Sequence, residues 1–97
     1  MTAYVLIVRH TTSDPAGIAR YAELARHAPT DKLQVLASKT CEFQVLEGDK
    51  ETEAVVVLQF PTMEDALDWY HSDAYQKALP HRLASGAFSM YVVKGVH

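Results

Sequence analysis

Two segments of the chain are apolar at almost every position, and this restricts how they can be buried. Residues 3–10 read Ala-Tyr-Val-Leu-Ile-Val-Arg-His, and residues 53–60 read Glu-Ala-Val-Val-Val-Leu-Gln-Phe. Their β-branched and aromatic content indicates strands. Because neighbouring side chains of a strand point to opposite faces, each strand is apolar on both faces. An antiparallel sheet with one wet face alternates apolar and polar residues, so this sheet needs cover on both sides.

The segments around these strands alternate between helix and strand signals. Asp14-Pro15 marks a helix start, in which Asp14 can cap free amides. One helical face then follows at the expected spacing, formed by Ile18, Tyr21, Ala22 and Ala25. Residues 33–47 are interpreted as one long strand with an irregularity near Ser38-Lys39. A turn at residues 47–50 joins it to the strand over 53–60, which predicts a hairpin.

The last third of the chain predicts two helical pieces and a final strand. Thr62 and Asp65 have the spacing of a capping box, and Ser72-Asp73 indicates a fresh helix start. The first piece has the apolar stripe Met63, Ala66, Leu67 and Tyr70, and the second has Tyr75, Ala78, Leu79 and Arg82. Pro80 is expected to kink or split the second piece because it removes a helical hydrogen bond. Ser85-Gly86 ends the helix before a strand over residues 87–93.

The resulting order, β-α-β-β-α-β, is typical of an α+β, ferredoxin-like protomer with a four-stranded antiparallel sheet. With 97 residues, the chain is expected to form a single domain over residues 1–97. Two helices can cover only one face of such a sheet. The other apolar face therefore predicts a homodimer in which two sheets pack face to face.

Composition excludes several classes of partner. The formal charge is −3, and the nine Lys and Arg residues are spread singly, so a nucleic-acid surface is not expected. Cys41 is the only cysteine, which excludes an intrachain disulfide and a Cys-based metal cluster, and we expect a buried, inert thiol. The longest apolar run, residues 3–8, is too short to cross a membrane. Without a basic or cleavable leader pattern, the expected location is the cytoplasm.

Polar aromatic residues gather where the two predicted helical pieces meet. Residues 69–75 read Trp-Tyr-His-Ser-Asp-Ala-Tyr, and Pro80-His81-Arg82 follows shortly after. Arg82 shares the core-facing stripe of Tyr75 and Ala78, although a guanidinium is rarely buried without a partner. Three interpretations stay open for it: a structural ion pair with a carboxylate such as Glu42, an anchor for an anionic ligand, or a side chain that the Pro80 kink turns to solvent.

The other candidate residues also have two interpretations each. Trp69, Tyr70 and Tyr21 are either core residues with one hydrogen bond or walls of a pocket. Tyr75 is expected to anchor the second helical piece. His10 ends the first strand, where it is either a general base or a satisfied structural residue. His81 flanks the aromatic cluster, and its spacing from His71 matches no metal site.

Several of these motifs together resemble an uncharacterised bacterial family called domain of unknown function 1330. The resemblance spans about residues 3–96 and implies membership of the dimeric α/β-barrel superfamily, and hence a ferredoxin-like protomer and a homodimer. The superfamily includes cofactor-independent monooxygenases, isomerases, dehydratases, haem-degrading enzymes and plain binding proteins. Residues 29–40 depart from the family, whose members often carry a Gly-rich stretch there. The motifs are Ala3-Tyr4-Val5, residues 45–49, residues 55–57, residues 60–64, and Trp69-Tyr70-x-Ser72-x-x-Tyr75-Gln76 through Arg82.

The first functional hypothesis is a cofactor-free pocket for a small polar or anionic organic molecule, which the protein binds or converts. Arg82 would hold an anionic group, Tyr70 or His10 would transfer a proton, and the remaining ligand-binding candidates are Trp69, Tyr21, Tyr75 and His81. The second hypothesis is a non-catalytic binding or interaction homodimer whose aromatics are core residues. A weaker third one, suggested only by some superfamily members, is haem binding through a histidine.

Overall fold

A computed structural model describes residues 1–48 and 51–97. Seven elements follow one another along the chain. They are β1 (Ala3–Thr12), α1 (Pro15–Ala25), β2 (Gln34–Ala37), β3 (Ala54–Phe60), α2 (Met63–His71), α3 (Asp73–Ala84) and β4 (Gly86–Lys94). Within the described part of the chain, no helix has the length and apolarity needed to span a membrane.

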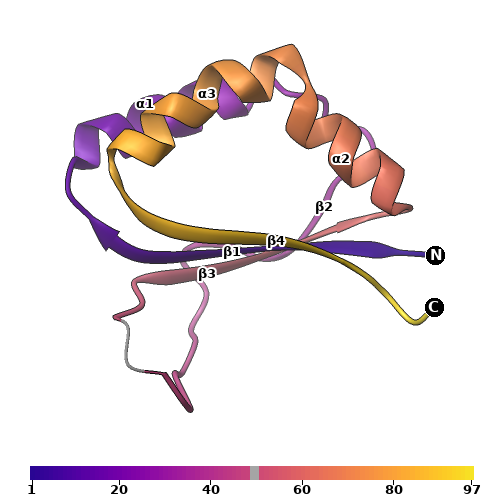
Figure 1. The fold of residues 1–97 in the computed structure, drawn as a ribbon, viewed down its shortest axis with the longest axis horizontal. Helices are drawn as coiled ribbons and strands as arrows, with labels where there is room; N and C mark the ends of the chain where they lie inside the picture. The colour runs from indigo at the N-terminus through magenta and orange to yellow at the C-terminus, as the bar shows by residue number, and fades with distance from the viewer. Residues whose placement is uncertain (49–50) are drawn as a thin grey trace.

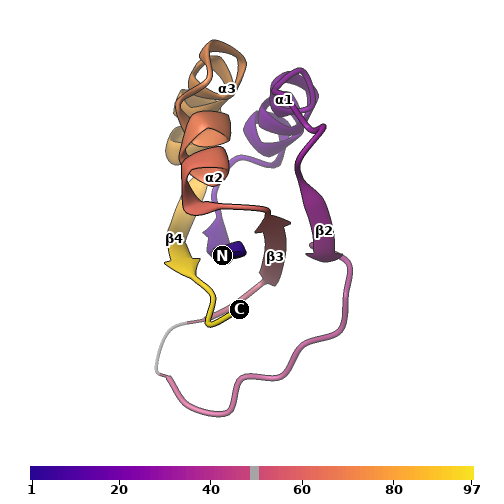
Figure 2. The same cartoon turned by 90° about the vertical axis from the view of Figure 1, so that its right-hand side faces the viewer.

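The four strands form one antiparallel sheet in the order β2-β3-β1-β4, with all helices on one face (Figures 1 and 2). The central strand β1 places Val5 opposite both Leu58 of β3 and Val92 of β4. Directly opposed residues share a face, so this register assigns each parity of β1 up to Arg9, and the residues of β3 and β4 opposite it, to one face of the sheet. The predicted ferredoxin-like fold is confirmed, with the second helical region divided into α2 and α3.

The core lies between the sheet and the helices. Ala3, Val5 and Ile7 of β1 are buried there, together with Leu58 and Phe60 of β3. The helices contribute their own buried side chains to the same cluster, namely Ala66, Trp69 and Tyr75. Three rings contact one another in sequence within it at tilted angles, because the centre of the Trp69 ring lies 5.5 Å from that of Phe60 and 4.4 Å from that of Tyr75.

The opposite side of the sheet, which we call the open face, has no helix against it (Figure 2). Register places on it the second parity of each long strand, comprising Tyr4, Leu6, Val8, Val55, Val57, Tyr91 and Val93. Tyr91 and Val93 remain 58% and 46% exposed. The apolar character that the sequence predicts for both faces is therefore present, and one of the two faces is bare in the single chain.

The helix starts agree with the sequence at two positions and differ at a third. Thr62 accepts a hydrogen bond from the Asp65 amide, and Ser72 accepts one from the Tyr75 amide. Each bond satisfies a free amide of the first helical turn. Asp14 occupies the cap position of α1 but makes no side-chain cap bond, so that detail of the prediction is wrong.

Pro80 neither splits α3 nor ends it, because the helix continues to Ala84. The expected split is therefore wrong. The cost of one missing amide bond is outweighed by the burial of Tyr75 and Ala78 along the same helix. The end of the helix at Ser85, in contrast, is as predicted.

The predicted long strand over residues 33–47 is also wrong, because β2 covers only Gln34–Ala37. Beyond it the Cys41 amide bonds the Ser38 carbonyl in a turn, which carries the chain away from β3. Residues 38–48 then run past the sheet on the side away from the helices (Figure 1). The alternating pattern of this segment therefore does not mark sheet pairing. The predicted turn at 47–50 lies partly outside the described residues.

Cys41 lies in this segment and is exposed, so the expected buried thiol is wrong as well. Its sulfur accepts a hydrogen bond from the Ser38 amide at 3.4 Å. Hydrogen bonds from the Ser38 side chain and amide lower the pKa of the thiol from its ordinary value. Cys41 is exposed because the predicted strand, which would have buried it in the sheet, does not form at this position.

Helices α1 and α3 approach each other closely at Gly17. A Cβ at this position would collide with the Ser85 Oγ. Ser85 is buried, and its hydroxyl donates to the His81 carbonyl. Its own carbonyl accepts from the amides of Ser13 and Asp14 at 2.8 and 3.1 Å. Glycine is required here so that the two helices can lie side by side.

Candidate functional site

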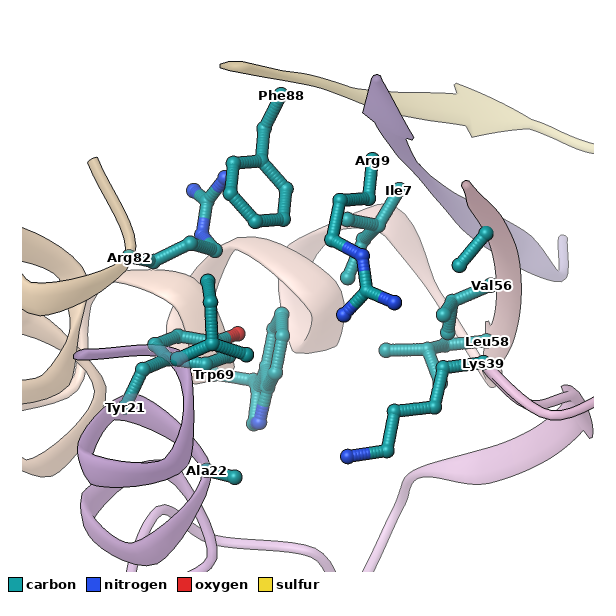
Figure 3. Close-up of a pocket in the computed structure, with 12 residues that line it drawn as sticks. Ile7, Arg9, Tyr21, Ala22, Lys39, Val56, Leu58, Trp69, Arg82 and Phe88 are labelled. Carbon is teal, nitrogen blue, oxygen red and sulfur yellow. The ribbon is translucent and has the colours of Figure 1, made fainter. Parts of the chain in front are cut away.

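A cleft of about 230 Å³ opens between α1 and the helix-facing side of the sheet (Figure 3). We call it the Arg82 cleft. Most of its wall is aliphatic or aromatic, with three cationic side chains placed among these groups. The lining residues are Ile7, Arg9, Ile18, Tyr21, Ala22, Lys39, Ala54, Val56, Leu58, Trp69, Arg82 and Phe88.

Arg82 is the most unusual of these residues because it is only 3% exposed. Its guanidinium carbon lies 5.0 Å from the centre of the Phe88 ring and 5.7 Å from that of Tyr21. Its Nη2 donates weakly to the Met90 sulfur at 3.7 Å, and its buried Nε has no hydrogen-bond partner. Aromatic faces and a thioether stabilise a cation, but they leave its charge uncompensated.

Of the three interpretations of Arg82, the solvent-facing one is wrong, and the ion pair has no carboxylate partner among the described residues. In residues 1–48 and 51–97, no carboxylate lies within ion-pair distance of the guanidinium. Glu42 is exposed on the segment that leaves the sheet, so it cannot act as a buried counterion. The side chain is not turned to solvent either, since Arg82 is buried and α3 continues through Pro80. A buried cation at the wall of a cleft is the arrangement that remains.

Arg9 and Lys39 were not among the residues predicted for the site. Both side chains point into the cleft, Arg9 from β1 and Lys39 from the turn after β2 (Figure 3). Arg9 Nε lies 3.3 Å from Glu53 Oε1 without a directed hydrogen bond. A signal for Arg9 was present in the sequence, because it shares the parity of Val5 and Ile7 and therefore faces the helices.

Glu53, the partner of Arg9, is held by Thr12. Its two carboxylate oxygens accept from the Thr12 hydroxyl at 2.6 Å and the Thr12 amide at 3.2 Å. These hydrogen bonds, with a smaller contribution from Arg9, lower the pKa of Glu53. The carboxylate is therefore charged at neutral pH and balances Arg9.

Tyr21 and Tyr75 form a pair of hydroxyl groups 2.9 Å apart next to the cleft. Their rings meet edge to face with centres 6.0 Å apart. Burial, and then the neighbouring Tyr75, raise the pKa of Tyr21 far above its ordinary value. The predicted wall position of Tyr21 agrees with its place in the cleft. Tyr75 lies behind it, fully buried, and anchors α3 as expected.

Trp69 and Tyr70 have exchanged the roles that the helical stripe predicts. Trp69 is 7% exposed, faces the core and lines the Arg82 cleft. Tyr70 is half-buried and lines a second hollow of about 190 Å³ between α2 and β4, together with His71. Tyr70 and Arg82 therefore do not share a pocket, and the hypothesis that pairs them is not supported by the geometry.

The two histidines predicted for the site lie outside the cleft. His10 is on the open face, with Nδ1 3.0 Å from the Glu51 carbonyl oxygen and Nε2 3.0 Å from the Ser89 Oγ. These contacts agree with the structural interpretation of His10. His81 is exposed on α3. In the described part of the chain, no three His, Cys, Asp or Glu residues gather in a way that could hold a metal ion.

Solved structures share this fold at low sequence identity. The chain is similar to a protein of unknown function from Rhodopseudomonas palustris, with 17% identity, a TM-score of 0.67, and coverage of 99% of this chain and 83% of that one. It is also similar to a dimeric protein of unknown function from Bacteroides fragilis, with 8% identity, a TM-score of 0.59, and coverage of 97% and 96%. At these identities the likeness concerns the fold alone.

A third similar structure is the cofactor-independent oxygenase SnoaB from Streptomyces nogalater. It has 10% identity, a TM-score of 0.55, and coverage of 99% of this chain and 93% of that one. A comparison with curated proteins gives no match. The family described as Domain of unknown function (DUF1330) matches residues 2–96, which is nearly the whole chain, and the chain therefore belongs to this family.

Proposed function

We propose that the protein binds a small anionic organic molecule in the Arg82 cleft. The observation that carries this proposal is the burial of Arg82 without a carboxylate partner among the described residues. Leaving a buried charge uncompensated costs several kcal/mol. A bound anion removes this cost, so the folded chain is built to gain stability from such a ligand.

Binding without base catalysis is the form of this proposal that the geometry favours. The Tyr21 hydroxyl is protonated at neutral pH, because the ordinary pKa of tyrosine is about 10 and burial raises it further. Tyr21 can therefore donate a hydrogen bond to a ligand but cannot accept a proton as a general base. None of the residues lining the described cleft is a histidine or a carboxylate. This composition also gives no support to haem ligation in the cleft.

A second candidate is a cofactor-independent enzyme acting on the same class of molecule. The hydroxyl pair of Tyr21 and Tyr75 favours it, because it places a hydrogen-bond donor beside the cleft that can orient a polar group of the substrate. The similar fold of an oxygenase is consistent with this candidate and does not decide it. Product formation from a bound acid under air, followed by mass spectrometry, separates the two. Recovery of unchanged acid after long incubation supports binding alone.

We also propose that the working unit is a homodimer formed through the open face. The exposed apolar residues of this face continue onto the segment beyond β2, where Phe43, Val45 and Leu46 are 38%, 48% and 86% exposed. This segment projects past the open face, where a second sheet would lie (Figure 1). Burying such surfaces favours association at about 25 cal/mol per Å² before entropy is deducted.

The binding proposal is tested by a thermal-shift screen of small acids, phenols and quinones. We expect acids to raise the melting temperature of the native chain, and the shift to vanish in Arg82→Met, which keeps the length and burial of the stem. Arg20→Met is the matched control, since Arg20 pairs with Glu23 on the exposed side of α1. Stabilisation by acids that survives in Arg82→Met contradicts the proposal.

A further inference from the structure

The charges around the Arg82 cleft limit the kind of anion that it can hold. This step rests on the proposed function. Arg82 is buried and uncompensated, Arg9 is paired with Glu53, and Lys39 is exposed to water. The described wall therefore carries one buried positive charge in excess. One negative charge on a ligand neutralises it, whereas a second would be buried without a partner at considerable cost.

The hydrogen-bond donors of the wall indicate the shape of the charged group. The buried side-chain atoms without a partner in the described residues are the Nε atoms of Arg9 and Arg82, and both residues line this cleft. Guanidinium groups bind a planar carboxylate well, because two parallel N–H donors meet two oxygens. A phosphate monoester or inorganic phosphate carries up to two charges near neutral pH, and the second charge would have no buried partner in this wall.

The remaining wall indicates what the rest of the ligand is made of. Between Arg9 and the helices, the cleft is lined by aliphatic and aromatic carbon, and the indole of Trp69 closes one side (Figure 3). Polar substituents that lie against this apolar part of the wall, away from Tyr21, Arg9 and Lys39, would lose their water without gaining partners. The apolar wall is formed by Ile7, Ile18, Ala22, Ala54, Val56, Leu58 and Trp69.

The volume of the cleft limits the size of the part of the ligand that it can enclose. Its volume is about 230 Å³. A cavity of roughly 150 Å³ accommodates benzene in a protein interior. The cleft therefore has room for one six-membered ring or a branched chain of similar size, together with a carboxylate.

We propose that the ligand is an amphipathic monocarboxylic acid with a compact apolar body, bound as its anion. The carboxylate lies at the end where Phe88 separates Arg82 from Arg9, which is the cross-strand neighbour of Phe88. The ring or branched chain lies against Leu58 and Trp69. The ligand class is thus defined by one negative charge, two acceptor oxygens and an apolar body about the size of one six-membered ring.

Isothermal titration of the native chain at pH 7.5 tests the ligand class directly. The probes are benzoate and cyclohexanecarboxylate, compared with benzamide, succinate and inorganic phosphate. We expect both monocarboxylates to bind, and benzamide to bind at least 10-fold more weakly because it leaves the charge uncompensated. Succinate and phosphate are expected to bind at least 10-fold more weakly than benzoate, because they bury a second charge.

Two variants then test which residues contact the carboxylate and which contact the apolar body of the ligand. Arg82→Met is expected to lower benzoate affinity by about 10- to 100-fold. Val56→Thr has nearly the same shape but puts a hydroxyl on the apolar wall, and we expect it to weaken cyclohexanecarboxylate by about 3- to 10-fold. Arg20→Met leaves both affinities unchanged. Circular dichroism confirms that each variant is folded, and the comparison of probes on the native chain needs no variant.

The possible results distinguish a failure of the proposed ligand class from a failure of the proposed anion site. If phosphate or succinate binds as tightly as benzoate and loses affinity in Arg82→Met, the cleft holds an anion but the ligand class is wrong. If benzamide equals benzoate, the requirement for one negative charge is also wrong. If no probe shows binding that depends on Arg82, the anion site itself is overturned.

Discussion

The guanidinium of Arg82 stacks on the ring of Phe88, with 5.0 Å between the guanidinium carbon and the ring centre. Phe88 belongs to β4 and lies directly opposite Arg9 of β1 in the sheet. The sheet therefore positions one aromatic ring between two arginines, and this ring keeps the two guanidinium groups apart. A cation held by aromatic faces keeps its charge available to a ligand, which an ion pair would not allow.

Replacing Phe88 with Leu is expected to lower the free energy of unfolding by about 1–2 kcal/mol, because the apolar volume is nearly kept but the cation–π contact is lost. Urea unfolding measures this change. In the Arg82→Met background the same replacement should cost about 1 kcal/mol less, since the cation is absent. Equal costs in the two backgrounds would show that the stacking contributes nothing.

Tyr21→Phe is expected to change the alkaline stability of the protein. The ordinary pKa of tyrosine is about 10.0, and the folded value is higher because of burial. The folded state therefore holds the Tyr21 proton more tightly than the unfolded state does. The contribution of Tyr21 to the free energy of unfolding is complete below pH 10 and declines above it. The decline is at most about 1.4 kcal/mol per pH unit.

Urea unfolding of the native chain and Tyr21→Phe between pH 8 and 11 checks this expectation. At pH 8 the variant should be less stable by about 1 kcal/mol, because the hydrogen bond to Tyr75 is lost. Above pH 10 its stability should fall less steeply than that of the native chain. Parallel slopes for the native chain and Tyr21→Phe would contradict the assigned burial.

Gly17→Ala should destabilise the protein, although alanine is normally preferred to glycine inside a helix by about 1 kcal/mol. The added methyl meets the Ser85 Oγ at the contact between α1 and α3. We expect a net loss of about 1–3 kcal/mol from overpacking. Adding Ser85→Ala removes the colliding oxygen and should recover part of this loss. Thermal or urea unfolding decides the matter, and a more stable single variant would rule out the close approach.

Tyr91→Glu places a charge on the open face and should abolish the proposed dimer. Sedimentation at low micromolar concentration is expected to give a dimer for the native chain and a 10.8 kDa species for the variant. Leu83→Glu is the matched control, because Leu83 is 61% exposed on α3, on the helix side of the molecule. A native chain that sediments at 10.8 kDa would remove the dimer from the proposal.

The fold could be predicted from the sequence because its signals are local. The two-faced strands, the caps at Thr62 and Ser72, and the helix end at Ser85 each depend on a few neighbouring residues. The segment after Ala37 could not be predicted, because its alternating pattern resembles a strand although a turn at Ser38 removes it from the sheet. Periodicity indicates where a strand can form, and pairing decides whether it does.

The candidate site was predicted less completely, because a cleft is made by residues far apart in the chain. Arg82 and Tyr21 were found from their places on apolar helical faces. His10 and Tyr70 were expected near Arg82, but the register of β1 and the rotation of α2 direct them elsewhere. Arg9 was missed because a charged residue at a strand end is easily assigned to solvent, although its parity with Ile7 indicated the helix-facing side.

Trp69 lines three hollows that border the helix layer, at the Arg82 cleft, beside Tyr70, and beside Lys32. It is also the only tryptophan in the sequence. Its fluorescence therefore comes from a single indole that touches every one of these spaces. Occupancy of any of them alters the emission of that one ring, so the protein carries an intrinsic optical reporter of its own binding state.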